Sequence, residues 1–373
     1  MINVLFYAEE LSIGGVENMM LQWIKFRTSD IHIDLLVRKV KDEAYRQEFV
    51  KLGCKVFEAN CSVKNIPHKI KFLSQVLDAN KYDIVHVHTS LATDFFVLMV
   101  AKNKGIKHRI AHSHNVPIFS NKTTRIADKL CKPLLRYYAT NYFGCSEDAA
   151  TALFGKKQPK NTKYIIIKNG IDTKNYMFSF KNRNEFRKEI NATRETFIIG
   201  SIGRLDYQKD YMFLLSIIEK ILPSLKTKKI KVVIAGEGGE RKKMLEFARK
   251  TDINLCLLGK RNDVNKILSG FDLFVLTSRY EGFPVVMMEA QANGLACIVS
   301  EAVPEEALLD NKNYRIPKIE VEKWCQIITN FIEQYSFNEN HRIQGSIVVK
   351  SFGYDINSCA KEISLLYKKI CNN

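Results

Sequence analysis

Leu273-Phe-Val-Leu-Thr-Ser-Arg-Tyr-Glu-Gly-Phe-Pro-Val-Val-Met-Met-Glu-Ala-Gln-Ala-Asn-Gly294 is the stretch of sequence that decides the fold of this chain. Its first four residues are apolar and predict a short buried strand. Pro284 stands where a helix would begin, because a residue without an N–H loses nothing at that position. The mostly apolar residues 285–292 predict the helix itself. Strand, glycine turn and helix N-terminus together predict an anion site, since the unpaired amides point outward and the helix dipole favours negative charge.

Two glutamates flank this turn and predict contacts with a sugar. Glu281 precedes the helix, and Glu289 lies one to two turns inside it, with its side chain leaning back toward the N-terminus. A carboxylate has two acceptor oxygens, which suit the two neighbouring hydroxyls of a ribose. The segment therefore predicts a sugar at Glu281, a diphosphate at the amides of residues 282–286 and a ribose at Glu289. The alternative is a pair of solvated glutamates beside an ordinary strand–helix connection.

Length and composition predict a two-domain globular protein. The 373 residues exceed one typical hydrophobic core, and 46% of them are hydrophobic. The first ten residues do not have the pattern of a signal peptide, and no apolar run reaches the roughly 18 residues that span a bilayer. Nine cysteines without a Cys-x-x-Cys pair indicate reduced thiols. We therefore expect a cytoplasmic protein.

Positive charge is concentrated in one part of the chain. Lys and Arg number 57 against 40 Asp and Glu, a net charge of +17, and the excess is largest between residues 102 and 168. Residues 122–136 place Lys or Arg at steps of three and four beside Ile126, Leu130 and Leu134. That basic amphipathic pattern can lie in a membrane interface, so the inner face of the cell membrane is an expected partner and a solvated basic helix is the alternative. Nucleic acid is not expected, because no basic groove with interleaved aromatics and no recognition helix is visible.

Apolar runs alternate with helical patterns along the chain, which predicts parallel sheets covered on both faces. In such sheets ligands bind at the carboxyl ends of the strands. Gly14 and Gly15 follow the first strand and let a backbone approach a ligand closely, although a plain tight turn fits them as well. The motif Gly-x-Gly-x-x-Gly is absent there, which argues against NAD or FAD. The predicted strands are 2–7, 33–37, 55–57, 84–88, 109–112, 142–145, 165–167, 197–202, 231–235, 255–258, 273–276 and 296–300.

Histidines stand at the ends of two predicted strands. His86 and His88 end one strand, and His112 and His114 end the next, with Asn115 after them. His-x-His spacing suits zinc, but no carboxylate or cysteine completes such a site nearby. A neutral histidine both donates and accepts, which suits sugar hydroxyls. We expect no metal here, and inert core or loop histidines remain the alternative, above all for His86.

Loops of the second half carry basic residues and glycines. Arg204 and Lys209 follow the strand at 197–202; an arginine can bind phosphate through two N–H groups, and a lysine adds a point charge. Gly236 and Gly238 end the next strand and permit a close backbone approach, for which a nucleobase is the candidate. The polar segment 174–196 predicts the connection between the domains.

Several motifs follow one another along the chain: Gly14-Gly15, His112, Asn169-Gly-Ile-Asp172, Gly203-Arg204 with Lys209, Gly236-Glu-Gly238, and Glu281 with Glu289. Their order resembles that of retaining glycosyltransferases of family 4. Stretches 109–115 and 276–295 look most like bacterial enzymes that extend capsular or exopolysaccharide repeat units. The resemblance implies the α/β GT-B fold, two Rossmann-like domains with parallel sheets facing across a cleft. Residues 1–174 with 353–373 would form the acceptor-binding domain and residues 175–352 the nucleotide-sugar domain.

The resemblance also implies roles for the matching residues. Arg204 and Lys209 would neutralise the diphosphate, Glu289 would hold the ribose and Glu281 the transferred sugar. The remaining donor contacts would come from Gly15, Gly236, Gly238 and the turn of Gly282, Phe283 and Pro284 beneath the phosphates. His112 would sit at the reacting sugar, and His114 and Asn115 would contact the acceptor.

The implied reaction moves a hexosyl group, with retention, from a nucleotide diphosphate sugar to a hydroxyl of a glycan acceptor, expected to be lipid-linked. The resemblance favours UDP as the nucleotide. No Asp-x-Asp pair occurs in the chain, so Arg204, Lys209 and the helix amides would stabilise the leaving diphosphate without a metal or other cofactor. A donor phosphate oxygen would take the acceptor's proton, with Glu281 as nucleophile the rival mechanism. Domain closure around residues 174–196 would position the substrates. Two other functions stay open, a GT-B nucleotide-sugar 2-epimerase and a basic nucleic-acid-binding protein.

Overall fold

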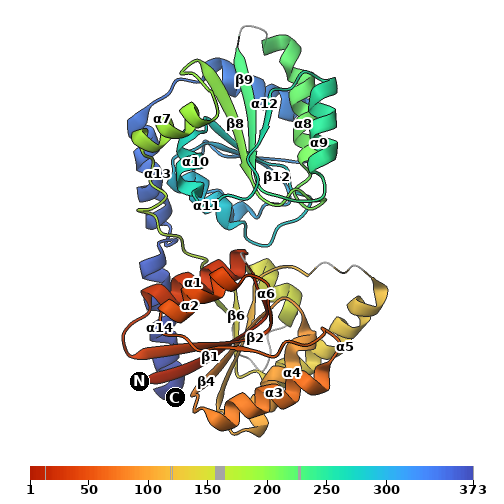
Figure 1. Cartoon of the computed structure of the whole chain (residues 1–373), viewed down its shortest axis with the longest axis vertical. Helices are drawn as coiled ribbons and strands as arrows, with labels where there is room; N and C mark the ends of the chain where they lie inside the picture. Colours follow the sequence, from red (N-terminus) through yellow and green to blue (C-terminus); the bar gives the residue numbers. More distant parts are fainter. Residues whose placement is uncertain (13, 118, 120, 156–163, 226–227, 373) are drawn as a thin grey trace. The chain divides into compact units, whose positions relative to one another are not determined.

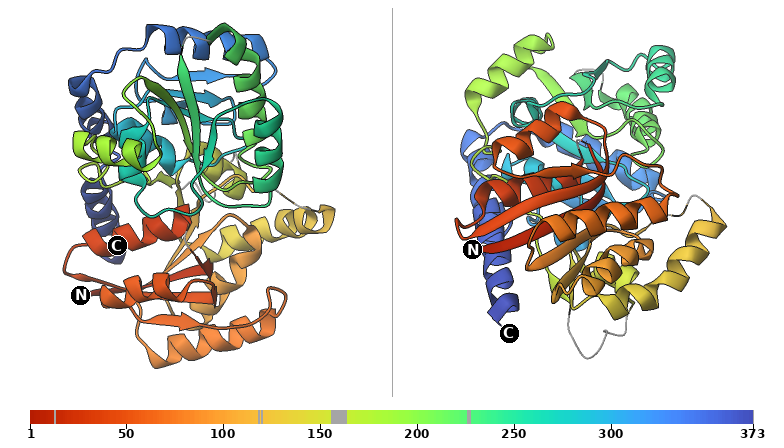
Figure 2. Two further views of the ribbon diagram at one scale, coloured as in Figure 1. Left: turned by 45° about the horizontal axis from the view of Figure 1, so that its top comes forward. Right: turned by 60° about the horizontal axis from the view of Figure 1, so that its bottom comes forward.

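The computed structural model describes residues 1–12, 14–117, 119, 121–155, 164–225 and 228–372. The chain forms two compact units. Unit 1 comprises Met1–Gly170 and Asp355–Asn373, and unit 2 comprises Ile171–Tyr354. The divisions expected from the sequence lie within a few residues of these boundaries. Both ends of the chain belong to unit 1 (Figure 2).

A seven-stranded parallel sheet forms the centre of unit 1, in the order β3-β2-β1-β4-β5-β6-β7 (Figure 1). Successive side chains of a strand point to opposite faces, and both faces of this sheet are covered. Val4 and Phe6 of β1 belong to one core with helices α1 (Gly15–Phe26) and α14 (Ile356–Asn372). Leu5 and Tyr7 belong to another core with α3 (Ile66–Ala79) and α4 (Phe95–Asn103). The strands are β1 (Ile2–Leu11), β2 (Ile31–Val40), β3 (Val56–Glu58), β4 (Ile84–Thr89), β5 (His108–Ser113), β6 (Asn141–Gly144) and β7 (Ile165–Ile166).

Four helices of unit 1 begin at residues that the sequence marks as caps. Side chains of Asp42, Asn65, Asn121 and Ser146 each accept a hydrogen bond from a backbone N–H of the first turn, which satisfies a donor that the helix itself leaves unpaired. The last helix of the chain returns to this unit and packs on α1. The helices are α1 (Gly15–Phe26), α2 (Glu43–Lys51), α3 (Ile66–Ala79), α4 (Phe95–Asn103), α5 (Lys122–Tyr138), α6 (Glu147–Phe154) and α14 (Ile356–Asn372).

Unit 2 is built in the same way around a six-stranded parallel sheet in the order β10-β9-β8-β11-β12-β13 (Figure 1). Its strands are β8 (Thr196–Ile202), β9 (Lys229–Ala235), β10 (Leu255–Leu257), β11 (Leu273–Leu276), β12 (Cys297–Ser300) and β13 (Tyr314–Ile316). Its helices are α7 (Phe180–Glu189), α8 (Tyr211–Ile221), α9 (Arg241–Lys250), α10 (Val264–Gly270), α11 (Val285–Ala292), α12 (Val321–Gln334) and α13 (Glu339–Ser351).

The predicted strands are all present, and β11 and α11 have the predicted bounds. The prediction of two Rossmann-like units with parallel sheets is confirmed. The sequence pattern missed β13 and α13, and it placed a polar connection where α7 lies.

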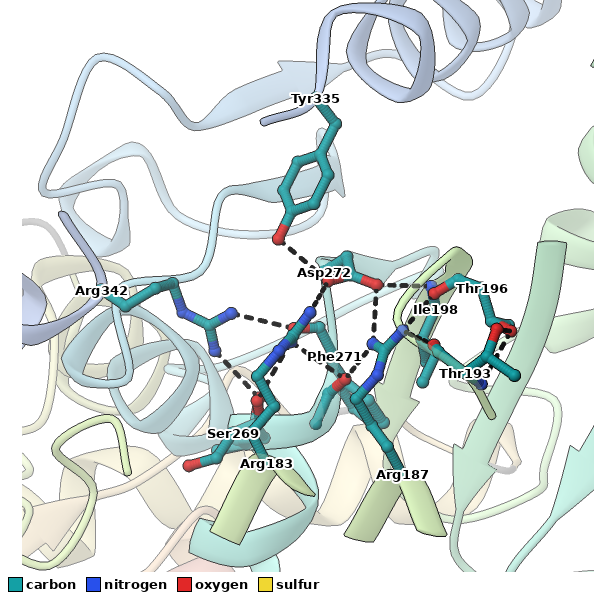
Figure 3. A network of polar contacts seen from close by, with 12 residues as sticks. Arg183, Arg187, Thr193, Thr196, Ile198, Ser269, Phe271, Asp272, Tyr335 and Arg342 are labelled. Carbon is teal, nitrogen blue, oxygen red and sulfur yellow. Dashed lines mark hydrogen bonds and ion pairs between the residues drawn. The ribbon is translucent and has the colours of Figure 1, made fainter. Parts of the chain in front are cut away.

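The segment 174–196 is not a free connection, because α7 is fixed to unit 2 by a buried ion-pair network (Figure 3). Asp272 is 3% exposed; one of its oxygens accepts from Arg183 at 2.6 Å and from Tyr335 at 2.9 Å, and the other accepts from Arg187 at 3.0 Å. The amide of Ile198 donates to it at 2.8 Å. Residues 174–196 are therefore part of unit 2, and the boundary between the units lies before them, at Gly170.

The arginines of this network also bond the carboxyl end of α10. Arg183 and Arg187 donate to the carbonyls of residues 269–271, and Arg342 of α13 donates to Leu268 and Phe271. The partial negative charge of a helix C-terminus favours such cations. Burial raises the pKa of Asp272, but the two arginines outweigh it and hold that pKa below its usual value.

Candidate active site

Lys209 and Glu281 form a nearly buried ion pair at the carboxyl ends of β8 and β11. Nζ of Lys209 lies 2.6 Å from Oε1 of Glu281, and the two side chains are 13% and 7% exposed. The hydroxyl of Ser278 donates to the same carboxylate oxygen. An ammonium has three donors, and within the described part of the chain the bond to Glu281 is the one drawn from Lys209 Nζ. Two donors therefore remain for a further anion.

Hydrogen bonds between two loops bring this pair together. The amide of Arg279 donates to the carbonyl of Gln208 at 2.8 Å, and the side-chain amide of Gln208 donates to the carbonyl of Tyr280 at 3.1 Å. The loop after β8 is thus fastened to the loop after β11. Two residues that the sequence places 72 positions apart meet at one sheet edge.

Arg204 lies on the same loop with most of its guanidinium in solvent. Its side chain is 73% exposed, Nη2 donates to Gln208 at 2.8 Å, and Asp206 lies 3.4 Å away. The exposed N–H groups remain accessible to a ligand. Lys209 therefore lies against Glu281, and Arg204 stands on the same loop, bonded to Gln208.

The N-terminus of α11 adds unpaired amides next to Glu281. Pro284 is the N-cap residue, and no side chain caps the helix. The first-turn amides of Val285 and Val286 have no acceptor within a helix. Gly282, Phe283 and Pro284 are buried, and the Phe283 ring stacks on Tyr354 at 5.2 Å. Phe283 thus anchors the turn through packing within unit 2.

Glu289 is buried one turn inside α11. It is 8% exposed, and burial raises its pKa to about 7, partly offset by a hydrogen bond from the Tyr176 hydroxyl. Its carboxyl group therefore titrates near neutral pH. Tyr176 was missed by the sequence analysis, because nothing in the local sequence pairs it with a residue so far along the chain.

At three glycines of this site, other atoms of the protein occupy the space that a Cβ would need. A Cβ on Gly236 would collide with the carbonyl oxygen of Gly203, and one on Gly238 would collide with that of Leu205. A Cβ on Gly203 would meet Lys209 Cε at 2.8 Å. These glycines allow loops to stack closely and let Lys209 reach across to Glu281. The sequence predicted a close backbone approach to a nucleobase at Gly236 and Gly238; the structure shows a close approach between two loops of the protein itself.

In unit 1, Gly15 is exposed at the first position of α1, with open space where a Cβ would stand. The N-cap Gly14 has no side-chain cap. Glu17 lies in the same first turn, and burial raises its pKa. The α1 N-terminus can approach a ligand through its backbone, with a carboxyl group beside it.

The four histidines form a buried stack between β4 and β5. His86 Nε2 lies 3.1 Å from His112 Nδ1, and His88 Nδ1 lies 2.9 Å from His114 Nε2. Trp23 of α1 stacks on His112 at 5.7 Å. Burial lowers the pKa of all four imidazoles, to about 3 for His114, so each is neutral at physiological pH.

A cavity of about 700 Å³ opens in unit 1 at the carboxyl ends of β1, β4 and β5. His88 and His114 line it, whereas His112 is fully buried and is not among the lining residues. Asn115 is exposed and likewise lies outside the lining. The structure thus places His114 at the cavity and His112 one layer behind it, and it adds His88, which the sequence had left without a role.

Polar groups of this cavity are suited to hydroxyls. Glu9 accepts from Lys69 at 2.9 and 3.1 Å and from Arg38 at 2.7 Å. Asp94 accepts from the Thr89 hydroxyl at 2.6 Å, and burial raises its pKa to about 6. Carboxyl groups at the wall favour a ligand rich in hydroxyl donors over a bare phosphate.

Ring nitrogens of His86, His88 and His112 lie within 4.8 Å of one another, a spacing that could admit a metal. Both nitrogens of His86 already have hydrogen-bond partners. The rings of His86 and His88 are stacked at 4.2 Å, so their in-plane lone pairs run side by side instead of converging on one point. Zinc needs converging ligands, and this arrangement does not fit it.

A second cavity, of about 650 Å³, lies in unit 2 beside Asp272, Lys312, His341 and Arg342. Asp272 precedes β11, so this cavity lies at the amino end of that strand. Ligands of open parallel sheets bind at the carboxyl ends. We therefore place the site at Lys209, Glu281 and Glu289 and not in this cavity.

Comparisons with known proteins agree with this geometry. The family model described as Glycosyltransferase Family 4 matches residues 13–175, and the model described as Glycosyl transferases group 1 matches residues 182–345. EpsF of Bacillus subtilis (strain 168), which is named as a glycosyltransferase, is 30% identical over 314 residues, covering 81% of this chain and 80% of EpsF. The chain belongs to the family 4 glycosyltransferases.

Other relatives extend the match to nearly the whole chain of this glycosyltransferase. The capsular polysaccharide biosynthesis glycosyltransferase CapH of Staphylococcus aureus is 24% identical, covering 98% of this chain and 99% of CapH. HepE of Anabaena, solved in complex with UDP-glucose, superimposes with a TM-score of 0.82 at 18% identity, covering 99% of this chain and 100% of HepE. The fold is GT-B, as predicted.

Proposed function

We propose that this glycosyltransferase moves a hexosyl group from a UDP-sugar, with retention, to a hydroxyl of a lipid-linked glycan in capsular or exopolysaccharide synthesis. The observation that carries the proposal is the Lys209–Glu281 pair at the N-terminus of α11, with the buried Glu289 one turn inside. Fixed cations, unpaired amides and two carboxylates stand within one short stretch of sheet edge. That combination matches a diphosphate flanked by two sugars.

Two relatives support the substrate classes. An Escherichia coli relative named UDP-Gal:alpha-D-GlcNAc-diphosphoundecaprenol alpha-1,3-galactosyltransferase is 28% identical, covering 80% of this chain and 79% of its own length. HepE has been solved with UDP-glucose. We extend a UDP-sugar donor and a lipid-diphosphate-linked acceptor to this chain on these grounds, together with the hydroxyl-binding cavity of unit 1.

In the proposed step, the bond between the anomeric carbon and the diphosphate oxygen breaks while the acceptor oxygen bonds to the same face of that carbon. The acceptor's proton passes to a phosphate oxygen of the departing UDP. Arg204, Lys209 and the α11 amides stabilise the charge that develops on the diphosphate. Each charge-assisted hydrogen bond contributes about 1.5–3 kcal/mol. No protein nucleophile and no cofactor are needed in this scheme; Glu281 as a nucleophile is the rival and would leave a covalent sugar on its carboxylate.

The test is a panel of nucleotide sugars incubated with and without a lipid-diphosphate-linked glycan. The expected result is acceptor-dependent glycosylation from one UDP-sugar, with the anomeric configuration of the donor kept in the product by NMR. Conversion of a UDP-sugar to its 2-epimer without acceptor would establish the epimerase alternative instead. An inverted product, or a glycosyl group trapped on Glu281, would contradict the proposed mechanism.

We further propose that α5 binds the inner face of the cell membrane. Its outward surface carries an apolar stripe in which Ile126, Leu130, Leu134 and Tyr137 are 58%, 70%, 40% and 56% exposed. Exposed basic residues lie beside the stripe at Lys122, Arg125 and Lys129, whereas Lys132 turns inward and donates to the Ala152 carbonyl at 2.7 Å. Such a helix binds anionic lipids through both apolar burial and charge. Four lysines between residues 156 and 163 that add to the basic excess lie outside the described residues.

No helix within the described ranges has the length and apolarity to cross a bilayer, so α5 would act as a surface anchor. Flotation with vesicles containing anionic lipid should recover the wild-type chain. The variant Leu130→Glu should float several-fold less, and Lys242→Glu on α9 serves as the matched control in unit 2. Equal flotation of the wild type with purely zwitterionic vesicles, or of Leu130→Glu with anionic vesicles, would contradict the proposal.

A further inference from the structure

A chain of hydrogen bonds runs from the last helix of the protein to His112. The hydroxyl of Tyr367 on α14 lies 2.7 Å from His86 Nδ1, and His86 Nε2 lies 3.1 Å from His112 Nδ1. His112 Nε2 is buried, and within the described residues it has no hydrogen-bond partner. Tyr367, His86 and His112 are each at most 1% exposed. The series of hydrogen bonds through these three buried side chains thus stops at one unpaired atom, Nε2 of His112.

The protons of this chain can be arranged in two directions. In the first, Tyr367 donates to His86, His86 donates from Nε2 to His112, and His112 keeps its own proton on Nε2. In the second, every donor reverses, His112 Nε2 is bare, and the hydroxyl proton of Tyr367 loses its acceptor. Among the described residues, His86 is the partner recorded for that hydroxyl. The first direction leaves one buried group unpaired, the Nε2–H of His112, whereas the second leaves two, the Tyr367 hydroxyl and the bare Nε2 of His112. One additional unpaired buried group costs about 1–3 kcal/mol, which favours the first direction by roughly 5- to 150-fold.

We propose that Tyr367 and His86 are positioning residues that hold His112 as the neutral tautomer with its proton on Nε2. The inference rests on the proposed function to the extent that His112 acts at the reacting sugar. With this tautomer His112 donates a hydrogen bond through Nε2 and cannot accept the acceptor's proton there. A substrate oxygen that reached this buried nitrogen would therefore accept a hydrogen bond from it, and the acceptor's proton would go to the departing phosphate.

Burial keeps Tyr367, His86 and His112 in their neutral forms. It raises the pKa of Tyr367 well above its usual value and lowers those of His86 and His112 well below theirs, with the neighbouring histidines adding to the effect on the imidazoles. A neutral phenol donates more readily than it accepts in this setting, because its proton has no other described acceptor.

The neighbouring pair of histidines lacks such a fixed end. His88 Nδ1 and His114 Nε2 share one hydrogen bond, while His88 Nε2 and His114 Nδ1 are both buried without a described partner. Either proton arrangement leaves one unpaired donor and one unpaired acceptor. This pair can present a donor or an acceptor to a ligand in the cavity that it lines, whereas His112 has one form only.

The experiment uses the full-length chain with ¹⁵N-labelled histidine and the variant Tyr367→Phe. Two-bond ¹⁵N–¹H NMR spectra report which ring nitrogen of His112 carries the proton, with His112→Gln used to assign its signals. The matched control is Tyr142→Phe, which also removes a buried hydroxyl of unit 1, one that donates to the Arg136 carbonyl at 2.7 Å. Thermal melting monitors the fold of each variant.

Wild type and Tyr142→Phe should show the His112 proton on Nε2. In Tyr367→Phe the two tautomers should approach equal populations, with turnover falling roughly two- to ten-fold and the KM for the donor little changed. A proton on Nδ1 in the wild type, or an unchanged tautomer in Tyr367→Phe, would overturn the proposal. Full turnover in His112→Gln would contradict a role of His112 in catalysis but would not affect the tautomer measurement. The failure of the catalytic role and the failure of the tautomer proposal can therefore be told apart.

Discussion

The two units each contain a buried polar cluster, and the clusters differ in how completely their hydrogen bonds are made. In unit 2, both carboxylate oxygens of Asp272 have two donors each, supplied by Arg183, Arg187, Tyr335 and the Ile198 amide (Figure 3). In unit 1, ring nitrogens of His88, His112 and His114 and the indole nitrogen of Trp23 are buried without described partners. The first cluster is complete without a ligand, and the second is not.

That difference separates two uses of buried polarity. A buried ion pair costs desolvation and stays in place through its added hydrogen bonds, so the Asp272 network acts on the fold by joining α7, α10 and α13 to β11. Buried groups without partners cost free energy in the folded state, and two of the residues that carry them, His88 and His114, line the cavity of unit 1. The Lys209–Glu281 pair lies between these cases, paired but with donors to spare.

The largest expected effect is on stability, from Asp272→Ala. Removing the carboxylate leaves Arg183 and Arg187 buried and unpaired, which should lower the free energy of unfolding by about 3–5 kcal/mol. Urea unfolding measures it. Glu195→Ala, which breaks an exposed pair with Lys229, is the control and should cost below about 1 kcal/mol. Equal losses in both variants would remove the distinction between the satisfied cluster and an ordinary surface pair.

Lys209→Ala should affect turnover more than folding. Loss of one charge-assisted contact to the diphosphate predicts a fall in kcat/KM of roughly 10- to 150-fold. Its melting temperature should fall less than that of Asp272→Ala, because Ser278 still donates to Glu281. Lys242→Ala, on exposed α9, serves as the control. A large melting shift with kcat/KM retained would show that the pair serves the fold, like Asp272.

The raised pKa of Glu289 predicts that binding of the UDP-sugar depends on pH. Its pKa in the folded protein is raised to about 7 from an ordinary value of 4.5, so the native state holds a proton that the unfolded chain releases between these values. Its contribution to stability is therefore present at low pH and is lost as pH rises toward 7. Affinity for a UDP-sugar, which needs the carboxylate as acceptor, should rise up to about ten-fold from pH 6 to pH 8.

The Glu289→Gln variant tests this assignment. Its affinity for a UDP-sugar should be weaker and flat over the same pH range, as measured by calorimetry. Its unfolding free energy should no longer fall between pH 5 and pH 8 to the same extent as that of the wild type. The same pH slope in both proteins would place the titrating group elsewhere.

The smallest expected effect is that of metal removal. Fixed cations replace a metal at the diphosphate in the proposed step, and the histidine stack does not offer converging ligands. Treatment with EDTA should therefore change turnover by less than about two-fold, well under the ten-fold that 1.4 kcal/mol represents. A loss of ten-fold or more that Mg²⁺, Mn²⁺ or Zn²⁺ restores would contradict both points.

Local signals in the sequence were sufficient for the parts of the fold that depend on local patterns. Apolar runs located the strands, and the Pro284 boundary located α11, because burial and helix initiation act over a few residues. They failed for α7, whose charged sequence becomes helical in contact with Asp272, 85 to 89 residues further along the chain. No local pattern records such a partner.

The same limit applies to the candidate site. Residue type and strand-end position nominated Arg204, Lys209, Glu281 and Glu289, and of these the structure pairs Lys209 with Glu281. The Tyr367–His86 hydrogen bond joins residues 281 positions apart. The contact of Gly236 with the Gly203 backbone depends on how two loops pack in the folded protein. Both required the three-dimensional arrangement.

The most direct test of the central claim is a crystal structure of the chain with UDP-glucose in the presence of EDTA. The diphosphate should lie within hydrogen-bonding distance of Lys209 Nζ, the Arg204 guanidinium and the Val285 and Val286 amides, with the ribose hydroxyls on Glu289. A nucleotide bound instead in the cavity beside Lys312 and His341, or bound away from these groups altogether, would contradict it.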